Sequence, residues 1–152
     1  GPDDVELAKQ LNDFLKDGRY LDVSANALKG DSDELAALHS RKVHVAIAQT
    51  LFTRASINSI RHNLNALLPS MQPDGVLYAP FLFCPDHHNL TEPLEHPVEN
   101  STPLTSYDTH APYHYTLEDM EYCAKDTPWK FQFIGDWDHP RNVKMGAFIL
   151  GG

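Results

Sequence analysis

Apolar residues along this chain recur at two spacings, one typical of helices and one of strands. Amphipathic periodicity, with polar residues able to cap the ends, predicts helices. Compact runs rich in Val, Ile, Leu and Phe predict strands. The predicted helices cover residues 4–17 and 32–40, a segment capped by Ser56 that reaches Met71, and a segment capped by Thr116. The predicted strands cover residues 19–25, 43–48, 76–83, 130–134 and 145–150.

The alternation of these elements predicts an α/β fold. Helices that follow strands cover both faces of a mainly parallel sheet, which gives a three-layer sandwich. The last two strands are joined by a short connection, so we expect them to form an antiparallel pair at one edge of the sheet. We expect one domain over residues 3–152, because Gly1-Pro2 resembles the remnant left by a tag-removing protease.

Three local features interrupt the pattern. Residues 84–113 show no periodicity and hold five prolines, which predicts a long loop or a cap insertion. Pro73-Asp74-Gly75 predicts a turn before the third of the predicted strands. Pro80 lies inside that strand, where it is expected to demote or bulge it because proline cannot donate to a ladder.

Charge and composition exclude several function classes. The net charge is -9, from 12 basic and 21 acidic residues without a basic cluster, so no nucleic-acid partner is expected. No apolar run approaches the roughly 20 residues of a membrane helix, so no membrane partner is expected. There is no cationic, apolar leader, and two unpaired cysteines suit a reducing compartment. These features predict a cytoplasmic location.

Several motifs resemble one enzyme family. Ala48-Gln-Thr-Leu-Phe-Thr53, Pro112-Tyr-His-Tyr115 and Ile134-Gly-Asp-Trp-Asp-His-Pro-Arg-Asn142 resemble the patterns AQS-V/L-FTH, PYHY-x-x-x-E-L and IGDWGHPRGQKM. Those patterns belong to class I S-adenosylmethionine (SAM) methyltransferases. The resemblance covers about residues 42–150 and implies a truncated Rossmann-like methyltransferase fold.

The resemblance is incomplete where the family binds its cofactor. Residues 18–26 resemble the family's second strand, "GRYVGIDAN", but Ser24 stands at the position of the ribose-binding acid and Asp22 lies two residues earlier. The family's first strand and its glycine-rich loop are absent. Because backbone N–H groups of such a loop approach the cofactor closely, their loss should abolish useful SAM affinity. The gap left in the sheet must be closed by the remaining strands or by another chain.

Two groups of residues are candidates for a site. Gln49, Thr50 and Thr53 follow a predicted strand at its carboxyl end, where α/β sheets place ligands, and together with Asp22 they are the candidate cofactor-binding relics. The resemblance implies that His114 lines the acceptor pocket or helps to deprotonate a hydroxyl. The structural alternative is that His114 orders a loop-to-helix junction through hydrogen bonds.

His139 is the second candidate catalytic residue and lies in Asp136-Trp-Asp-His-Pro-Arg141. The favoured interpretation of that segment is an ordered hairpin, with Pro140 in the turn and Asp136 or Asp138 paired with Arg141. A metal site is also conceivable in the loop, which holds several histidines. However, no tight zinc-like spacing occurs, so no metal ligand is assigned. The histidines in question are His87, His88, His96, His110 and His114.

Three functional hypotheses follow. The favoured one is a non-catalytic, methyltransferase-like domain that serves as a structural or protein-interaction module. It would bind no cofactor and would associate with a protein partner, a parent polypeptide or itself. The alternative is a SAM-dependent methyltransferase of a small hydroxylated molecule or sugar, completed by a partner or an upstream segment. The second alternative is a metal-binding module built on the histidine-rich loop.

Overall fold

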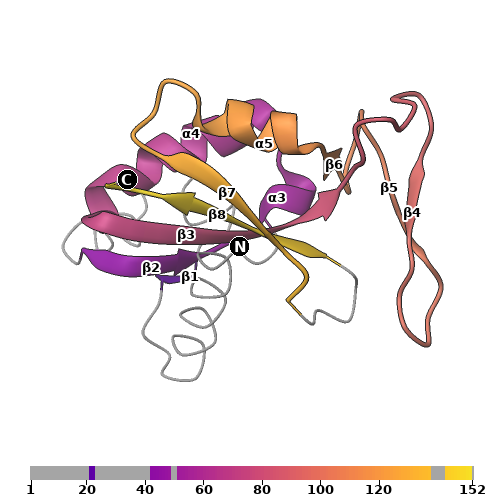
Figure 1. Cartoon of the computed structure of the whole chain (residues 1–152), viewed down its shortest axis with the longest axis horizontal. Helices are drawn as coiled ribbons and strands as arrows, with labels where there is room; N and C mark the ends of the chain where they lie inside the picture. The colour runs from indigo at the N-terminus through magenta and orange to yellow at the C-terminus, as the bar shows by residue number, and fades with distance from the viewer. Residues whose placement is uncertain (1–20, 23–41, 49–50, 138–142, 152) are drawn as a thin grey trace.

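The computed structural model describes residues 21–22, 42–48, 51–137 and 143–151 (Figure 1). The helices predicted over 4–17 and 32–40 lie outside these residues. The strands are β1 Leu21–Asp22, β2 Val43–Ile47, β3 Met71–Phe83, β4 Leu94–His96, β5 Leu104–Ser106, β6 His114–Tyr115, β7 Lys130–Gly135 and β8 Lys144–Ile149. The helices are α3 Leu51–Arg54, α4 Ile57–Leu67, α5 Leu117–Ala124 and the 3-10 helix η1 Leu68–Ser70.

The main sheet is mixed and has the order β1-β2-β3-β8-β7, with β6 also paired to β3. β1, β2 and β3 run parallel to one another, and β6 runs parallel to β3. β8 is antiparallel to both β3 and β7, which is the edge pair predicted for the end of the chain. Helices α4 and α5 lie together on one face of this sheet (Figure 1). The protein is therefore an α/β fold, and the predicted second helical layer falls outside the described residues.

The two faces of the sheet carry separate apolar clusters. The face beneath α4 and α5 packs aromatic rings of β3, β7 and β8 against the helices. The opposite face holds a smaller cluster that includes Tyr78 and Met145, both fully buried. Burial on both faces explains why the strand residues form continuous apolar runs instead of alternating with polar ones.

Gly146 of β8 makes the close packing of the helix-side cluster feasible. A Cβ atom at this position would lie 2.7 Å from the Phe131 ring and 3.3 Å from the Phe81 ring. Those two rings meet edge to face with their centroids 6.2 Å apart. The aromatic contact across β8 therefore depends on the missing side chain of the glycine.

Two predictions made from proline were wrong. Pro73-Asp74-Gly75 forms no turn before the strand, because β3 begins at Met71 and contains these residues as a bulge. Val43 pairs with Met71, whereas Val45 already pairs with Val76, so the extra β3 residues loop out between the two pairs. Pro80 does not demote the strand either, since β3 continues through it to Phe83 and Pro80 pairs with Met145.

Residues 84–113 contain more order than the sequence predicts. β4 and β5 form an antiparallel hairpin in which Leu94 pairs with Ser106 and His96 with Leu104. The hairpin projects from the end of the sheet where β6 lies (Figure 1). Strands of three residues are too short to give a readable alternation, so this order has to come from side-chain contacts with the body of the domain.

The predicted starts of α4 and α5 are confirmed. The Ser56 hydroxyl accepts a hydrogen bond from the Ser59 N–H and caps α4. Thr116 and Asp119 form a reciprocal capping box at the start of α5. Met120 and Cys123 of α5 are fully buried, and Leu117 is half-buried. Residue Met71, which we expected in the first of these helices, instead opens β3.

Trp129 ties the end of α4 to the start of β7. Its indole N–H donates a 2.9 Å hydrogen bond to the carbonyl of Leu64, which lies in the last turn of α4. Carbonyls in the last turn of a helix lack an intrahelical donor, so the indole satisfies a group that would otherwise be buried without a partner. Trp129 itself is 2 % exposed.

We expect Trp129→Phe to lower the free energy of unfolding by about 1–3 kcal/mol, because it leaves the buried Leu64 carbonyl without its donor. Urea denaturation measures this change. The matched control is Trp137→Phe, which removes an indole donor to the Val143 carbonyl from a half-buried position. An equal loss in both variants would contradict the role assigned to Trp129.

Candidate functional site

The structure describes three of the six predicted site residues. Asp22 lies in β1, Thr53 in α3 and His114 in β6. The side chain of Asp22 is outside the described part of the chain, and so are Gln49, Thr50 and His139 entirely. Thr53 and His114 are therefore the two predicted site residues whose side chains the structure describes.

Thr53 and His114 approach each other through their neighbours. The Tyr113 N–H donates a 2.8 Å hydrogen bond to the carbonyl of Thr53. His114 pairs with Leu82 near the carboxyl end of β3. The structure therefore brings α3 and β6 together at the end of the sheet where α/β proteins place ligands.

Asp22 does not join this group. Through its pairing with Ile47, Asp22 is level with Tyr78 of β3. His114 is level with Leu82, four residues (82 − 78) farther along β3. At about 3.3 Å per residue, the backbone of Asp22 is at least roughly 13 Å away from that of His114. The proposed cofactor relic and the proposed catalytic histidine therefore do not form one site by direct contact.

His114 instead belongs to a buried polar cluster formed by His96, Ser106 and His114, here called the histidine–serine cluster. The Ser106 hydroxyl lies 2.7 Å from Nε2 of His96 and 2.9 Å from Nδ1 of His114. Ser106 is fully buried, and the two histidines are 5 % and 3 % exposed. One residue each from β4, β5 and β6 meets here, so the cluster anchors the projecting hairpin to the main sheet.

The proton count of this cluster is constrained. A serine hydroxyl carries a single proton, and Ser106 has a third neighbour in the Leu94 carbonyl at 3.4 Å. At least one histidine must therefore donate to the serine oxygen. Nε2 of His114 is buried and has no hydrogen-bond partner. Whichever tautomer His114 adopts, one ring nitrogen is left unsatisfied beside the edge-on ring of His88, 5.6 Å away between centroids.

Burial keeps both histidines neutral. Desolvation, followed by the charges of His114 and Lys144, lowers the pKa of His96 to about 4. Desolvation, followed by the charge of His88, also lowers the pKa of His114, while Asp108, Asp119 and a hydrogen bond with the Ser106 backbone raise it. Near neutral pH the cluster is therefore an uncharged network of hydrogen bonds.

The neighbouring thiol is equally inert. Cys84 follows β3 directly, is 1 % exposed, and its pKa is raised by burial and then by Asp119, Asp108 and Asp86. Burial also raises the pKa of Cys123 to about 12. A reactive cysteine needs a lowered pKa and access to solvent, and neither thiol has these properties.

The chemistry that the histidine–serine cluster can perform follows from its burial. A serine between two imidazoles could be activated as a nucleophile if a substrate reached it. However, Ser106 exposes no surface, so the cluster acts as a hydrogen-bonded clamp while the hairpin is in place. Within the described residues, no group of three or more His, Cys, Asp or Glu side chains is arranged to hold a metal ion.

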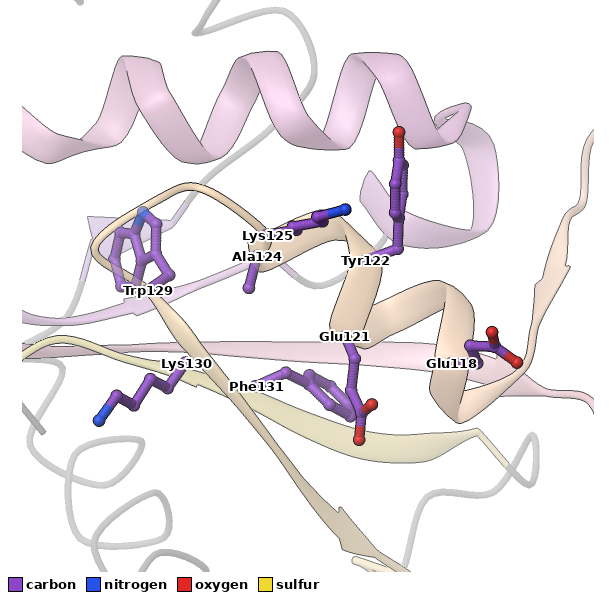
Figure 2. A pocket seen from close by; sticks show the side chains of 8 residues that line it. All are labelled: Glu118, Glu121, Tyr122, Ala124, Lys125, Trp129, Lys130 and Phe131. Atoms are coloured by element: carbon purple, nitrogen blue, oxygen red, sulfur yellow. The ribbon is translucent and has the colours of Figure 1, made fainter.

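A surface groove lies elsewhere, between α5 and β7 (Figure 2). It has a volume of about 490 Å³ and is lined by both apolar and charged side chains. The lining residues are Glu118, Glu121, Tyr122, Ala124, Lys125, Trp129, Lys130 and Phe131. None of them belongs to the predicted site, so this groove and the predicted site occupy different parts of the molecule.

Sequence reasoning missed Ser106, and it placed His96 only in a loose group of histidines. No local pattern marks them, because Ser106 meets its partners ten and eight residues away in sequence across a hairpin. The expected pairing of Asp136 or Asp138 with Arg141 involves Asp138 and Arg141, which lie outside the described residues. Within the described residues, the Asp136 carboxylate accepts a hydrogen bond from the ammonium group of Lys144 in β8.

Comparison with known proteins finds distant structural likeness. No family model matches the chain, and no curated protein matches it. Among solved structures, a SAM-dependent methyltransferase from Methanosarcina mazei matches with a TM-score of 0.44 and 14% identity. The match covers 71% of this chain and 57% of that enzyme. At this identity and TM-score, the likeness carries no argument about cofactor, substrate or activity.

The structure also bears on membrane association. Across the part of the chain that is described, no helix has both the length and the apolar character that crossing a bilayer requires.

The histidine–serine cluster predicts a pH dependence of stability. The folded-state pKa of His96 lies near 4, below its ordinary value of 6.5. Between about pH 6.5 and pH 4, His96 is protonated in the unfolded chain and neutral in the folded one. The free energy of unfolding is therefore highest above about pH 6.5 and falls as the pH drops toward 4. We expect a loss on the order of 1–3 kcal/mol across this window, measured by urea denaturation at several pH values.

His96→Gln should flatten this slope, because it removes the buried titrating group. His110→Gln controls for the loss of a histidine outside the cluster, since His110 is exposed. An unchanged slope in His96→Gln would remove His96 as the cause.

Proposed function

We propose that this chain is a methyltransferase-like scaffold domain that does not hold SAM by itself. It works as a structural or protein-interaction module, within a larger enzyme or by self-association. In this proposal the fold is a truncated Rossmann-like three-layer sandwich, and its second helical layer comes from the helices predicted over residues 4–17 and 32–40.

One observation carries the proposal: β1 pairs directly with β2. Leu21 is level with Ala46 and Asp22 with Ile47, in parallel register. In the family that the sequence resembles, the first strand of the fold and its glycine-rich loop would lie beside the equivalent of β2. Because β1 occupies that place, the sheet is closed here and offers no gap for a first strand from a partner.

The residues after β1 cannot replace the missing loop. Val23-Ser24-Ala25-Asn26 follows directly, without a glycine. None of the eight glycines of the chain forms a G-x-G pattern. Side chains at these positions keep backbone N–H groups away from a phosphate or carboxylate ligand, whereas glycine permits the close approach.

The carboxyl end of the sheet supports the same proposal. There the hairpin and β6 bury Ser106, His114 and Cys84 almost completely. A ligand site needs a concave space with a few converging polar groups. Here His96 and His114 instead contact the Ser106 hydroxyl, and these contacts anchor the hairpin.

We expect isothermal titration of SAM and of its demethylated product into the purified chain to give no heat of binding up to about millimolar ligand. A SAM-dependent methyltransferase with an intact glycine-rich loop, titrated in the same buffer, is the positive control. Binding at micromolar strength would contradict the scaffold proposal and would show that other residues hold the cofactor.

The second candidate function is a SAM-dependent methyltransferase that a partner or upstream segment completes, acting on a small hydroxylated molecule or sugar. The buried, unsatisfied Nε2 of His114 favours it, because such a nitrogen is suited to take a proton from a hydroxyl group. Here Asp22, Gln49, Thr50 and Thr53 would face the cofactor, and His114 and His139 the acceptor. SAM would then be the cofactor.

Turnover by the reconstituted enzyme tests this alternative. His114→Ala and His139→Ala should each lower kcat by about 10²-fold or more if these groups act as general bases. Full activity of both variants would reject the catalytic assignment.

A further inference from the structure

The outer edge of β7 has backbone groups that the sheet does not use. The Leu150 N–H donates to the Gly75 carbonyl, so the even-numbered residues of β8 face β3 and the odd-numbered ones face β7. Ala147, an odd-numbered residue, is level with Gln132 in β7. Because hydrogen-bonding directions alternate along a strand, Phe131 and Phe133 direct their N–H and carbonyl groups away from β8.

This edge runs beside the groove between α5 and β7. β7 ends the order of the main sheet among the described residues. The rings of Phe131 and Phe133 are half-buried against the helix-side cluster, so the edge is held rigidly by the core. A rigid strand edge with unused donors and acceptors is a template for pairing with another strand.

The helix above the groove adds a pattern of charge. Glu118, Glu121, Tyr122 and Lys125 stand at i, i+3, i+4 and i+7, which places them along one stripe of α5 and its end. All four are exposed, and Tyr122 is 50 % exposed. No ion pair joins Glu118, Glu121 or Lys125 to another side chain of the described residues. The stripe is therefore acidic at its start and basic at its end (Figure 2).

We propose that the edge of β7 and this stripe of α5 form a two-fold interface between two copies of the chain. In an antiparallel β7 pair, Phe131 exchanges backbone hydrogen bonds with Phe133 of the partner subunit, and Phe133 does so with the partner's Phe131. The two-fold axis then passes through Gln132, and the two main sheets become one continuous sheet.

Charge complementarity identifies a second copy as the occupant. Two-fold symmetry sets the neighbouring α5 helices antiparallel, so Glu118 lies toward the partner subunit's Lys125 and Lys125 toward the partner's Glu118. A stripe that runs from acidic to basic is complementary to itself only in this orientation. The chain carries a net charge of -9, so two copies repel on average, and the two Glu118–Lys125 pairs offset part of this repulsion.

This inference rests on the proposed scaffold function, to which it assigns the partner. Its test is a measurement of mass and does not involve SAM. A chain that neither dimerises nor binds SAM would overturn the interface and leave the scaffold proposal standing. A dimer that binds SAM would support the interface and overturn the scaffold proposal.

The test is sedimentation velocity of the full chain from about 1 to 200 μM. We expect a concentration-dependent shift from monomer to dimer. Glu118→Lys and Lys125→Glu should each weaken dimerisation about tenfold or more, because each sets like charges opposite one another. An equimolar mixture of the two variants restores both attractive pairs, so it should dimerise in the wild-type range.

Glu99→Lys and Lys42→Glu are the matched controls, since both residues are exposed and lie away from β7 and α5. Circular dichroism checks that α5 survives in each variant. Amide hydrogen exchange locates the strand contact, because the N–H groups of Phe131 and Phe133 should become more protected as the concentration rises. A monomer throughout the range, or a dimer that the charge reversals and the exchange pattern leave unaffected, would overturn the proposal.

Discussion

The arrangement of this domain depends on how β3 satisfies its backbone on both edges. β3 pairs with β8 along one edge, and with β2 and then β6 along the other. Pro80 has no N–H and lies on the second edge. The Tyr78 carbonyl accepts from Ala48 just before it, and the Cys84 N–H donates to Tyr115 just after it. Even-numbered residues of β3 direct their backbone groups toward this edge. Pro80 lies there between the residues paired with β2 and those paired with β6, so no strand requires the N–H group that proline lacks.

That interval decides where the other elements can go. On this edge no described strand pairs with β3 at Pro80, and α3, which comes after β2 in the chain, accepts a hydrogen bond at its Thr53 carbonyl from the Tyr113 N–H. The Tyr115 hydroxyl then donates to the Ala55 carbonyl at the end of α3. These bonds fix β6, and β6 carries His114 into contact with Ser106. The clamp on the hairpin is thus a consequence of a proline inside a central strand.

The parts of the fold that the sequence predicts are those held by short-range physics. β2, α4, α5, β7 and β8 follow from continuous apolar runs, helical periodicity and the caps at Ser56 and Thr116. The parts that it does not predict depend on partners far away in the chain. β4 and β5 have three residues each and persist through His96 and Ser106. The Pro73–Gly75 bulge exists because β2 and η1 fix where β3 must begin, which overrides the local preference for a turn.

For the site, the roles predicted for Thr53 and His114 stay predictions. The structure shows that their segments are joined by the hydrogen bond from the Tyr113 N–H to the Thr53 carbonyl and that His114 lies level with Leu82 near the carboxyl end of β3. Their surroundings could not be read from the sequence, because Ser106 reaches His114 only through the hairpin.

These surroundings change what His114 can do. An imidazole kept neutral by burial and bonded to a buried serine is suited to hold two elements together. The same ring would need the hairpin to move before it could meet a substrate. The edge that usually receives a ligand in an α/β sheet is here filled by the protein's own side chains. At the other end of the sheet order, among the described residues, β7 presents backbone groups that pair with no strand, and α5 presents exposed charged side chains.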